Sequence, residues 1–342
     1  MSRTEPAHPA DSADSAGVVG VNGFDGVVGV DVGGGGIRVR ADCAGTVTHG
    51  ENAIPVPRDR GRVDLERLAP QIAAVIEKAA PGVGRFTSMA IGITGLPGLV
   101  MDPDTLWHAL GDRFRLDTLV VAGDAVTTHV GALGFRQGVV VAAGTGVITL
   151  GTDLSGIWNQ SDGWGYLLGD HGGGAWIGMQ GLHAALRAHD GRVGGSPALR
   201  DHMTARFGHP LDLVALVHES ESAAHELASF TPLVAEAARA GDPVAGQIWT
   251  EAGRQLGQTA VAAASGLDPL FSWGGRLFDA ADLLMEPFQH TIRTMLPAAR
   301  FVQPQGTSAD GALALARAAA DGSVRPHSPY VHVFTNQRSP VR

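Results

Sequence analysis

Three glycine-rich turns recur along the sequence, each directly after a strand-like run. The first begins at Gly33 after 27–32, the second is Gly144-Thr145-Gly146 after 139–143, and the third is Gly274-Gly275-Arg276 after 270–273. Glycine has no side chain, so consecutive backbone N–H groups at such turns can close around phosphate oxygens. Because the turns lie far apart in the sequence, we expect two lobes of the molecule to share one nucleotide.

Composition restricts the classes of partner. The 342 residues favour about two domains, and the net charge of -9 argues against nucleic acid, which demands a basic face. No apolar run approaches the roughly 20 residues that cross a bilayer, so we expect a cytoplasmic protein without a membrane partner. Cys43 is the single cysteine, which excludes disulfides, thiolate zinc sites and an iron–sulfur cluster held within one subunit. The expected partner is a small molecule.

Periodicity divides the chain into an α/β first half and a mostly helical second half. Residues 1–25 and 323–342 have neither helical nor strand periodicity, so we expect tails there. We predict a first lobe over 26–135, joined by a C-terminal helix within 309–322, and a helix-rich second lobe over 136–308. The expected strands are 27–32, 37–41, 89–94, 119–122, 139–143, 147–151 and 269–272, and the expected helices are 64–80, 124–134, 174–190, 197–207, 222–240, 242–265, 279–295 and 309–320.

The first turn lacks both common nucleotide fingerprints. A Walker loop needs lysine, but Lys78 is the only lysine and lies far from any glycine turn, and no Gly-x-Gly-x-x-Gly is present. Asp31 ends the strand before the turn, where a carboxylate can hold Mg²⁺ through water. The alternative interpretation of Asp31 is a turn cap. We expect the turn glycines, Gly33, Gly34, Gly35 and Gly36, to bind phosphate.

A second carboxylate follows a buried strand. Asp124 ends the run 120–123 and opens a helix, one hairpin before the Gly144-Thr145-Gly146 turn. Placed there, its carboxylate can accept a proton from an acceptor hydroxyl in line with a γ-phosphate, and it can share the metal with Asp31. The alternative role is a helix N-cap, and the two roles are compatible.

These motifs together resemble the actin-like, hexokinase-like and Hsp70-like ATPase superfamily. The resemblance covers about 26 to 320 and is closest to the branch of N-acetylglucosamine kinases and BadF/BadG/BcrA/BcrD ATPases. The stretch 162–178, with Gly163-Trp164-Gly165 and Gly169-Asp170-His171-Gly172, is its most specific part. It implies two ribonuclease-H-like lobes with a central cleft, a homodimer, ATP and Mg²⁺. It also implies a general base at Asp124, adenosine binding by Gly274, Gly275 and Arg276, and sugar binding by Thr94, Gly95, Asp124, Gly163 and Asp170.

Departures from the family pattern concern the substrate. Gly35 stands where many relatives have threonine, so Arg38 or bare amides would compensate for the missing hydroxyl. His171 replaces the glutamate of N-acetylglucosamine kinases, and the chain looks similar to actinobacterial glucosamine kinases. This resemblance implies transfer of phosphate from ATP to the 6-hydroxyl of glucosamine. Asp162 or His171 would meet the amine, although a turn aspartate and a structural histidine are the alternative interpretations.

Other activities stay open at this stage. N-acetylglucosamine and glucose are alternative acceptors. Activators of radical dehydratases share the phosphate motifs, but they hold an iron–sulfur cluster through several cysteines, which this chain lacks. A regulatory nucleotide-binding protein would need neither Asp124 nor Asp170. The presence of both favours an enzyme.

Overall fold

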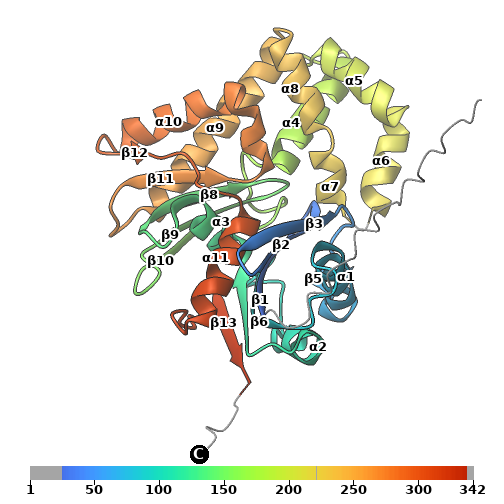
Figure 1. Cartoon of the computed structure of the whole chain (residues 1–342). Coiled ribbons are helices and arrows are strands. Elements are labelled where there is room, and N and C mark those ends of the chain that lie inside the picture. Colours follow the sequence, from blue (N-terminus) through green and yellow to red (C-terminus); the bar gives the residue numbers. More distant parts are fainter. Residues whose placement is uncertain (1–24, 221, 337–342) are drawn as a thin grey trace, which may run out of the picture.

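The computed structural model describes residues 25–220 and 222–336, and its core is two β-sheets that have helices between and around them (Figure 1). The first sheet has six strands in the order β13-β7-β6-β1-β2-β3, and the second has five in the order β10-β9-β8-β11-β12. The first sheet contains β1 (Gly26–Gly33), β2 (Gly36–Cys43), β3 (Thr46–Asn52), β6 (Phe86–Ile93), β7 (Thr118–Gly123) and β13 (Val331–Thr335). The second contains β8 (Gly138–Ala143), β9 (Val147–Thr152), β10 (Trp158–Asp162), β11 (Leu270–Gly274) and β12 (Arg300–Phe301).

The two sheets repeat one topology. In the first, β1, β2 and β3 form an antiparallel meander, and β6 and β7 then add in parallel beside β1. In the second, β8, β9 and β10 form the meander, and β11 and β12 add in parallel beside β8. The first two glycine turns thus lie at equivalent places, because they close the β1–β2 and β8–β9 hairpins, whereas the third follows the parallel strand β11.

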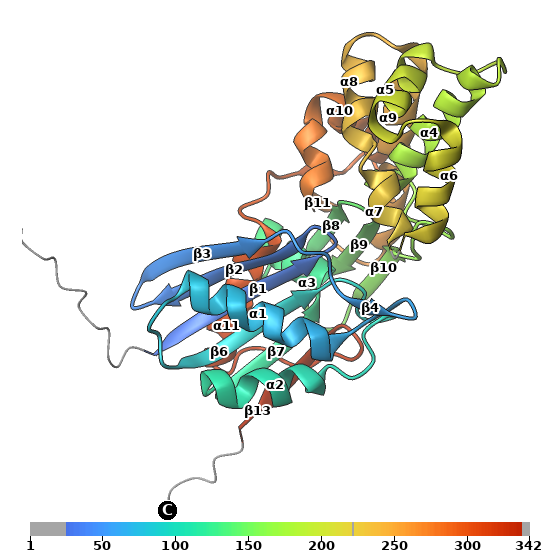
Figure 2. The same ribbon diagram turned by 90° about the vertical axis from the view of Figure 1, so that its right-hand side faces the viewer.

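Helices cover both faces of the first sheet. One face packs against α1 (Leu65–Ala79) and α2 (Asp104–Phe114), and the other packs against α3 (Asp124–Leu133) and α11 (Ser308–Ala320). Helix α3 also contacts β8, β9 and β11, so it lies between the sheets (Figure 2). A short hairpin of β4 (Arg58–Asp59) and β5 (Arg62–Val63) precedes α1.

Glycines permit the close packing of these central helices. A side chain at Gly29 of β1 would overlap the backbone of Leu313 in α11, and one at Gly311 of α11 would overlap the carbonyl of Thr127 in α3. The backbones of β1, α3 and α11 therefore approach as closely as helix and sheet geometry allows. This packing fixes where the strand ends that carry Asp31 and Asp124 lie.

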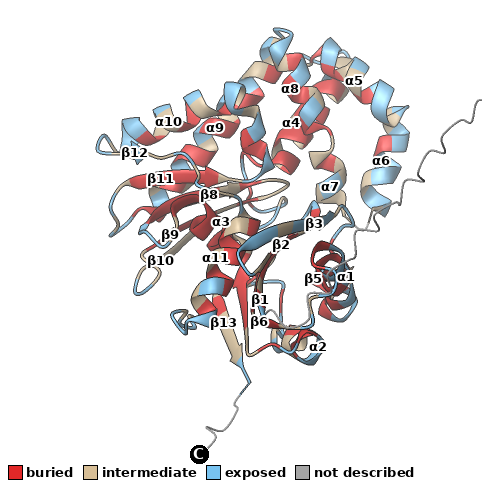
Figure 3. Ribbon diagram, in the orientation of Figure 1, coloured by how far each residue is buried: buried red, intermediate tan, exposed pale blue. Residues whose placement is uncertain are grey.

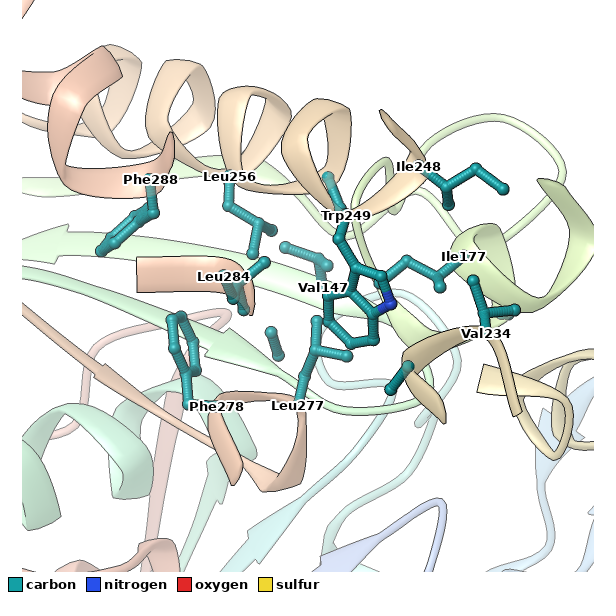
Figure 4. Close-up of a cluster of buried hydrophobic side chains, with 14 of the residues drawn as sticks. Val147, Ile177, Val234, Ile248, Trp249, Leu256, Leu277, Phe278, Leu284 and Phe288 are labelled. Atoms are coloured by element: carbon teal, nitrogen blue, oxygen red, sulfur yellow. The ribbon is translucent and has the colours of Figure 1, made fainter. Parts of the chain in front are cut away.

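The second sheet carries the helix-rich part of the chain. The helices are α4 (Gly174–His189), α5 (Pro197–Phe207), α6 (Pro210–Glu219), α7 (Ala223–Ala228), α8 (Thr231–Arg239), α9 (Pro243–Ala263) and α10 (Ala281–Met295), with the 3₁₀ turn η1 (Arg276–Ala280). Their apolar faces form a continuous buried core with the sheet (Figure 3). Trp249 of α9, which is 2% exposed, lies among Ile177, Val234 and Leu277 in this core (Figure 4).

Most elements lie where the sequence predicts them, with three differences. The expected helix over 222–240 is two helices, α7 and α8, because the chain turns at 229–230 before Pro232 starts α8. The elements that were not predicted are the strands β3, β4, β5, β10 and β12 and the helices α2 and α6, since short or weakly periodic elements give a poor signal in the sequence. The C-terminal tail expected over 323–342 is the third difference.

That expectation is wrong for residues 331–335, which form β13. This strand pairs antiparallel with β7 along the edge of the first sheet. Just before it, His327 and Tyr330 stack on Trp158 of β10, with ring centroids 4.5 and 5.5 Å from that of the indole. The strand is short and follows Pro326 and Pro329, so the sequence alone gives little sign of it. Its pairing with β7 stabilises it as a strand. The tail expected over 1–25 lies outside the described residues except for Asp25.

None of the helices that the structure describes is both long and apolar enough to pass through a membrane.

Candidate active site

Asp31 lies at the carboxyl end of β1, next to the first glycine turn. Its side chain is buried, and its two oxygens accept hydrogen bonds from different elements: Oδ1 from Ser308 Oγ at 2.8 Å and Oδ2 from Arg38 Nη1 at 3.2 Å. Burial raises the pKa of Asp31, and the bonds from Ser308 and Arg38 oppose that rise. Asp31 therefore does not cap its own turn. It is a buried acid held between β2 and α11.

Asp124 is the first residue of α3 and follows β7 directly. The Thr94 hydroxyl, at the end of the neighbouring strand β6, donates a hydrogen bond to its carboxylate, as does the backbone N–H of Ala125. Burial and the negative charge of Asp31 raise the pKa of Asp124 to about 7. A carboxylate with such a pKa can accept a proton near neutral pH, as a general base must. The adjacent ends of β1, β6 and β7 thus bring Asp31, Thr94 and Asp124 together.

Hydroxyl groups of the central helices connect the Asp31 carboxylate with the backbone carbonyl of Asp124. Ser308 Oγ, at the start of α11, lies 2.8 Å from Thr127 Oγ1, and that hydroxyl donates to the Asp124 carbonyl at 3.1 Å. Ser308 and Thr127 were not identified from the sequence, because nothing in an Ala-rich helix start indicates that it will meet a strand end 277 positions earlier. The one sequence signal for Ser308 is the Thr307–Asp310 capping box, which indicates where the helix begins but not which residue it contacts.

The three glycine turns lie close together. A Cβ at Gly34 would lie 3.5 Å from Thr145 Oγ1, so the first and second turns face each other across the two sheets. A side chain at Gly275, where φ is 95°, would overlap the carbonyl of Ala143 at the base of the second turn. Gly34, Gly35 and Gly275 are exposed. Their backbone groups are therefore accessible from outside the protein, and phosphate binding by these turns stays a prediction.

Asp162 and Asp170 belong to a second cluster, on the second sheet. The Oδ1 atom of Asp162 accepts the N–H groups of Gly163 at 2.9 Å and Asp170 at 2.6 Å, so it stabilises the loop that follows β10. Asp170 accepts the N–H of Gly165 at 3.0 Å and that of Val147, and a side chain at Gly146 would overlap its Oδ2. Burial and the nearby Asp162 charge raise the pKa of Asp170 to about 6. Asp170 thus packs against the Gly144-Thr145-Gly146 turn and stabilises its position.

His171, Asp162 and Trp164 line one pocket, together with polar side chains of α9. The other lining residues are Ser161, Leu168, Gly169, Gln255, Gln258, Thr259 and Ala262. Trp164 is 67% exposed. The same loop also exposes Leu167 and Leu168. Trp176, by contrast, packs against the core of the second sheet.

The residues present fit a hydrated Mg²⁺ ion near Asp31 and Asp124. Each of these carboxylates has a raised pKa, and the charge of one raises the pKa of the other, so a cation between them would offset an unfavourable pair of charges. Magnesium keeps several waters and takes one or two carboxylates plus substrate phosphates, so a full set of protein ligands is not required. Among the described residues, no three His, Cys, Asp or Glu side chains gather into a group that could hold a metal ion.

Known structures share this fold. A solved structure from Chromobacterium violaceum, described as a candidate N-acetylglucosamine kinase, is 27% identical, covers 85% of this chain and 99% of its own, and has a TM-score of 0.64. A glucokinase of the ROK family from Streptomyces griseus, solved with glucose and AMPPNP, shares the fold at 20% identity and a TM-score of 0.56 over 86% of this chain and 98% of its own. Two sheets of one topology with helices α3 and α11 between them define the actin-like ATPase fold.

Sequence relatives identify the family within that fold. The profile of the BadF/BadG/BcrA/BcrD ATPase family matches residues 28–316. The chain therefore belongs to this family, as its glycine turns predict. The N-acetylmuramic acid/N-acetylglucosamine kinase of Clostridium acetobutylicum is 29% identical over 212 residues, 59% of this chain and 68% of that enzyme. The N-acetyl-D-glucosamine kinase of Dictyostelium discoideum is 33% identical over 129 residues, 37% of this chain and 40% of that enzyme.

Proposed function

We propose that the protein is an ATP-dependent sugar kinase that phosphorylates the 6-hydroxyl of an amino sugar, glucosamine in the first place. The observation that carries this proposal is the position of Asp124: its carboxylate lies beside Thr94 and Asp31, at the strand ends next to the first glycine turn, with a pKa near 7. The family and the names of its relatives support phosphoryl transfer to a sugar.

In the proposed reaction, Asp124 accepts the proton of the sugar hydroxyl as that oxygen attacks the γ-phosphorus. Thr94 orients the carboxylate by its hydrogen bond, and the N–H groups of the glycine turns stabilise the phosphoryl oxygens. When bound, Mg²⁺ would offset charge on the phosphates. The hydroxyl proton passes to Asp124, the oxygen–phosphorus bond forms, and ADP departs with the electrons of the bond that breaks.

Two acceptors compete within this proposal. N-acetylglucosamine is supported by the names of both sequence relatives. Glucosamine is favoured by the pocket beside Asp162 and His171, because the second carboxylate oxygen of Asp162 has no partner among the hydrogen bonds of the described residues, and an ammonium group would complement it. The homodimer and the cytoplasmic location that the sequence predicts stay predictions.

The test is ADP release with ATP and Mg²⁺ in the presence of glucosamine, N-acetylglucosamine, N-acetylmannosamine or glucose. Turnover on glucosamine alone would support the first acceptor. Turnover mainly on N-acetylglucosamine would replace it with the second. If no sugar is phosphorylated, the proposed kinase activity is wrong, and ATP hydrolysis without acceptor would then indicate an activator or a regulatory ATPase.

A further inference from the structure

Two arginines from different sheets lie beside the same glycine of the first turn. A Cβ at Gly35 would lie 3.5 Å from Arg38 Nη2 and 3.9 Å from Arg276 Nη1. Arg38 belongs to β2 of the first sheet, whereas Arg276 follows the third glycine turn on the second sheet and starts η1. The two guanidinium groups therefore lie beside one exposed turn, and they come from different parts of the fold.

Of the two arginine charges at this place, the described residues pair only that of Arg38. Arg38 pairs with Asp31, which already has a second bond from Ser308. Arg276 is exposed and takes part in none of the ion pairs or side-chain hydrogen bonds found within 25–220 and 222–336. Two neighbouring guanidinium groups repel each other unless an anion lies between them.

The surroundings of the two arginines match the chemistry of a polyphosphate. The turn offers backbone N–H groups without side chains, and Thr145 Oγ1 lies next to Gly34 from the other sheet. Guanidinium groups bind phosphate oxygens with two parallel hydrogen bonds, which a lysine cannot do. The single lysine, Lys78, is in α1. The arginines are therefore the cations that the described chain presents at its glycine turns.

We infer that Arg276 is a phosphate-binding residue, which together with Arg38 holds the terminal phosphates of the nucleotide between the two sheets. This inference rests on the proposed use of ATP, and it replaces the adenosine contact that the resemblance implies for Arg276. The adenosine moiety would keep the backbone of Gly274 and Gly275. Since each arginine belongs to a different sheet, a bound triphosphate also links the two halves of the protein.

The experiment measures direct binding to the full chain, without sugar, by calorimetry. The probes are ATP, ADP, AMP, adenosine and inorganic tripolyphosphate. Arg276→Ala is expected to lower the affinity for ATP and tripolyphosphate by about tenfold or more, as loss of a charge-assisted hydrogen bond does. The affinity for adenosine and AMP is expected to change less than about twofold. Arg38→Ala should also lower the affinity for ATP and tripolyphosphate. The control is Arg300→Ala, an exposed arginine of β12 whose side chain is 63% exposed.

Two results would overturn the inference. If Arg276→Ala lowers the affinity for adenosine and AMP as much as that for ATP, the residue binds the nucleoside. If the affinity for no probe changes, the residue binds neither the nucleoside nor the phosphates. Arg276 is exposed, so the variant is expected to fold, and a thermal melt checks this. Binding that follows the expected pattern, together with no sugar phosphorylation by the wild type, would keep this inference and refute the proposed kinase activity, so the two failures can be told apart.

Discussion

At the scale of single residues, Asp124 has two opposite effects on the protein. As the proposed general base, its carboxylate must be charged, yet burial and the charge of Asp31 disfavour that form and raise its pKa to about 7. The folded state therefore binds a proton at Asp124 more tightly than the unfolded chain, in which the group has its usual pKa of about 4. Stability from this group is present below that unfolded value and is lost as the pH rises toward 7.

Asp124→Asn should separate these effects. We expect kcat to fall by about a hundredfold or more, as loss of a general base does, with little change in sugar binding. At pH 8 the free energy of unfolding should rise by about 1–2 kcal/mol, discounted because the residue is only partly buried. The measurements are steady-state kinetics and urea denaturation, with the exposed Asp112→Asn as the control. A kcat within tenfold of wild type would exclude Asp124 as the base.

Thr94 should control the pH at which the enzyme becomes active. Its hydrogen bond favours the charged form of Asp124, so Thr94→Val should raise the pKa of Asp124 above about 7. For the wild type we expect kcat/KM to rise with pH up to about 7 and then to level off. In the variant the rise should move to higher pH. An unchanged midpoint would show that this carboxylate does not govern the profile.

At the scale of elements, the site depends on the start of α11. Ser308 donates to Asp31 and contacts Thr127 of α3, so one hydroxyl connects β1 with both central helices. No other helix of the described chain holds Asp31 in this way, since its second partner comes from β2. The start of α11, late in the sequence, thereby determines how the Asp31 side chain is oriented at the end of β1.

Ser308→Ala tests this connection. Without the hydroxyl, the pKa of Asp31 should rise further, and the apparent affinity for Mg²⁺ and ATP should fall by several-fold, which corresponds to about 1 kcal/mol for one hydrogen bond. Higher Mg²⁺ or higher pH should partly restore activity, because both favour the charged carboxylate. The exposed Ser323→Ala is the matched control. A loss of kcat that neither condition restores would point to a structural fault in α11.

At the scale of the whole molecule, the C-terminal segment joins the two sheets. Strand β13 extends the first sheet, while His327 and Tyr330 stack on Trp158 of the second. Around this stack, Leu315 of α11, Val120 of β7 and Leu150 of β9 share one buried cluster. The contact between the lobes is therefore apolar and aromatic, away from the glycine turns.

Trp158→Ala should lower stability through this contact. Loss of the stacked indole is expected to cost about 1–3 kcal/mol of unfolding free energy, measured by chemical denaturation. Trp164→Ala removes the same kind of side chain from an exposed loop and should change the value by less than about 0.5 kcal/mol. Equal effects of the two substitutions would mean that the stack adds nothing to the stability of the molecule.

The repeated topology explains why the sequence was informative about the phosphate turns. Glycine must follow a strand wherever a bare backbone faces a ligand, so Gly34, Thr145 and Gly275 could be identified from local pattern alone. The strand ends that carry Asp31, Thr94 and Asp124 were predicted for the same local reason. The two similar lobes were expected from the family resemblance and not from local pattern, because the two sheets share a strand order rather than a sequence pattern.

What the sequence determined by itself was local: which runs form strands, where the glycine turns lie and which acids end strands. Only the tertiary structure decided which of these groups meet. It placed Ser308 on Asp31, Arg276 beside Gly35, Asp170 under Gly146, and β13 on β7. Those contacts join residues that are distant in the chain, and they depend on how helices pack between two sheets, which no local spacing records.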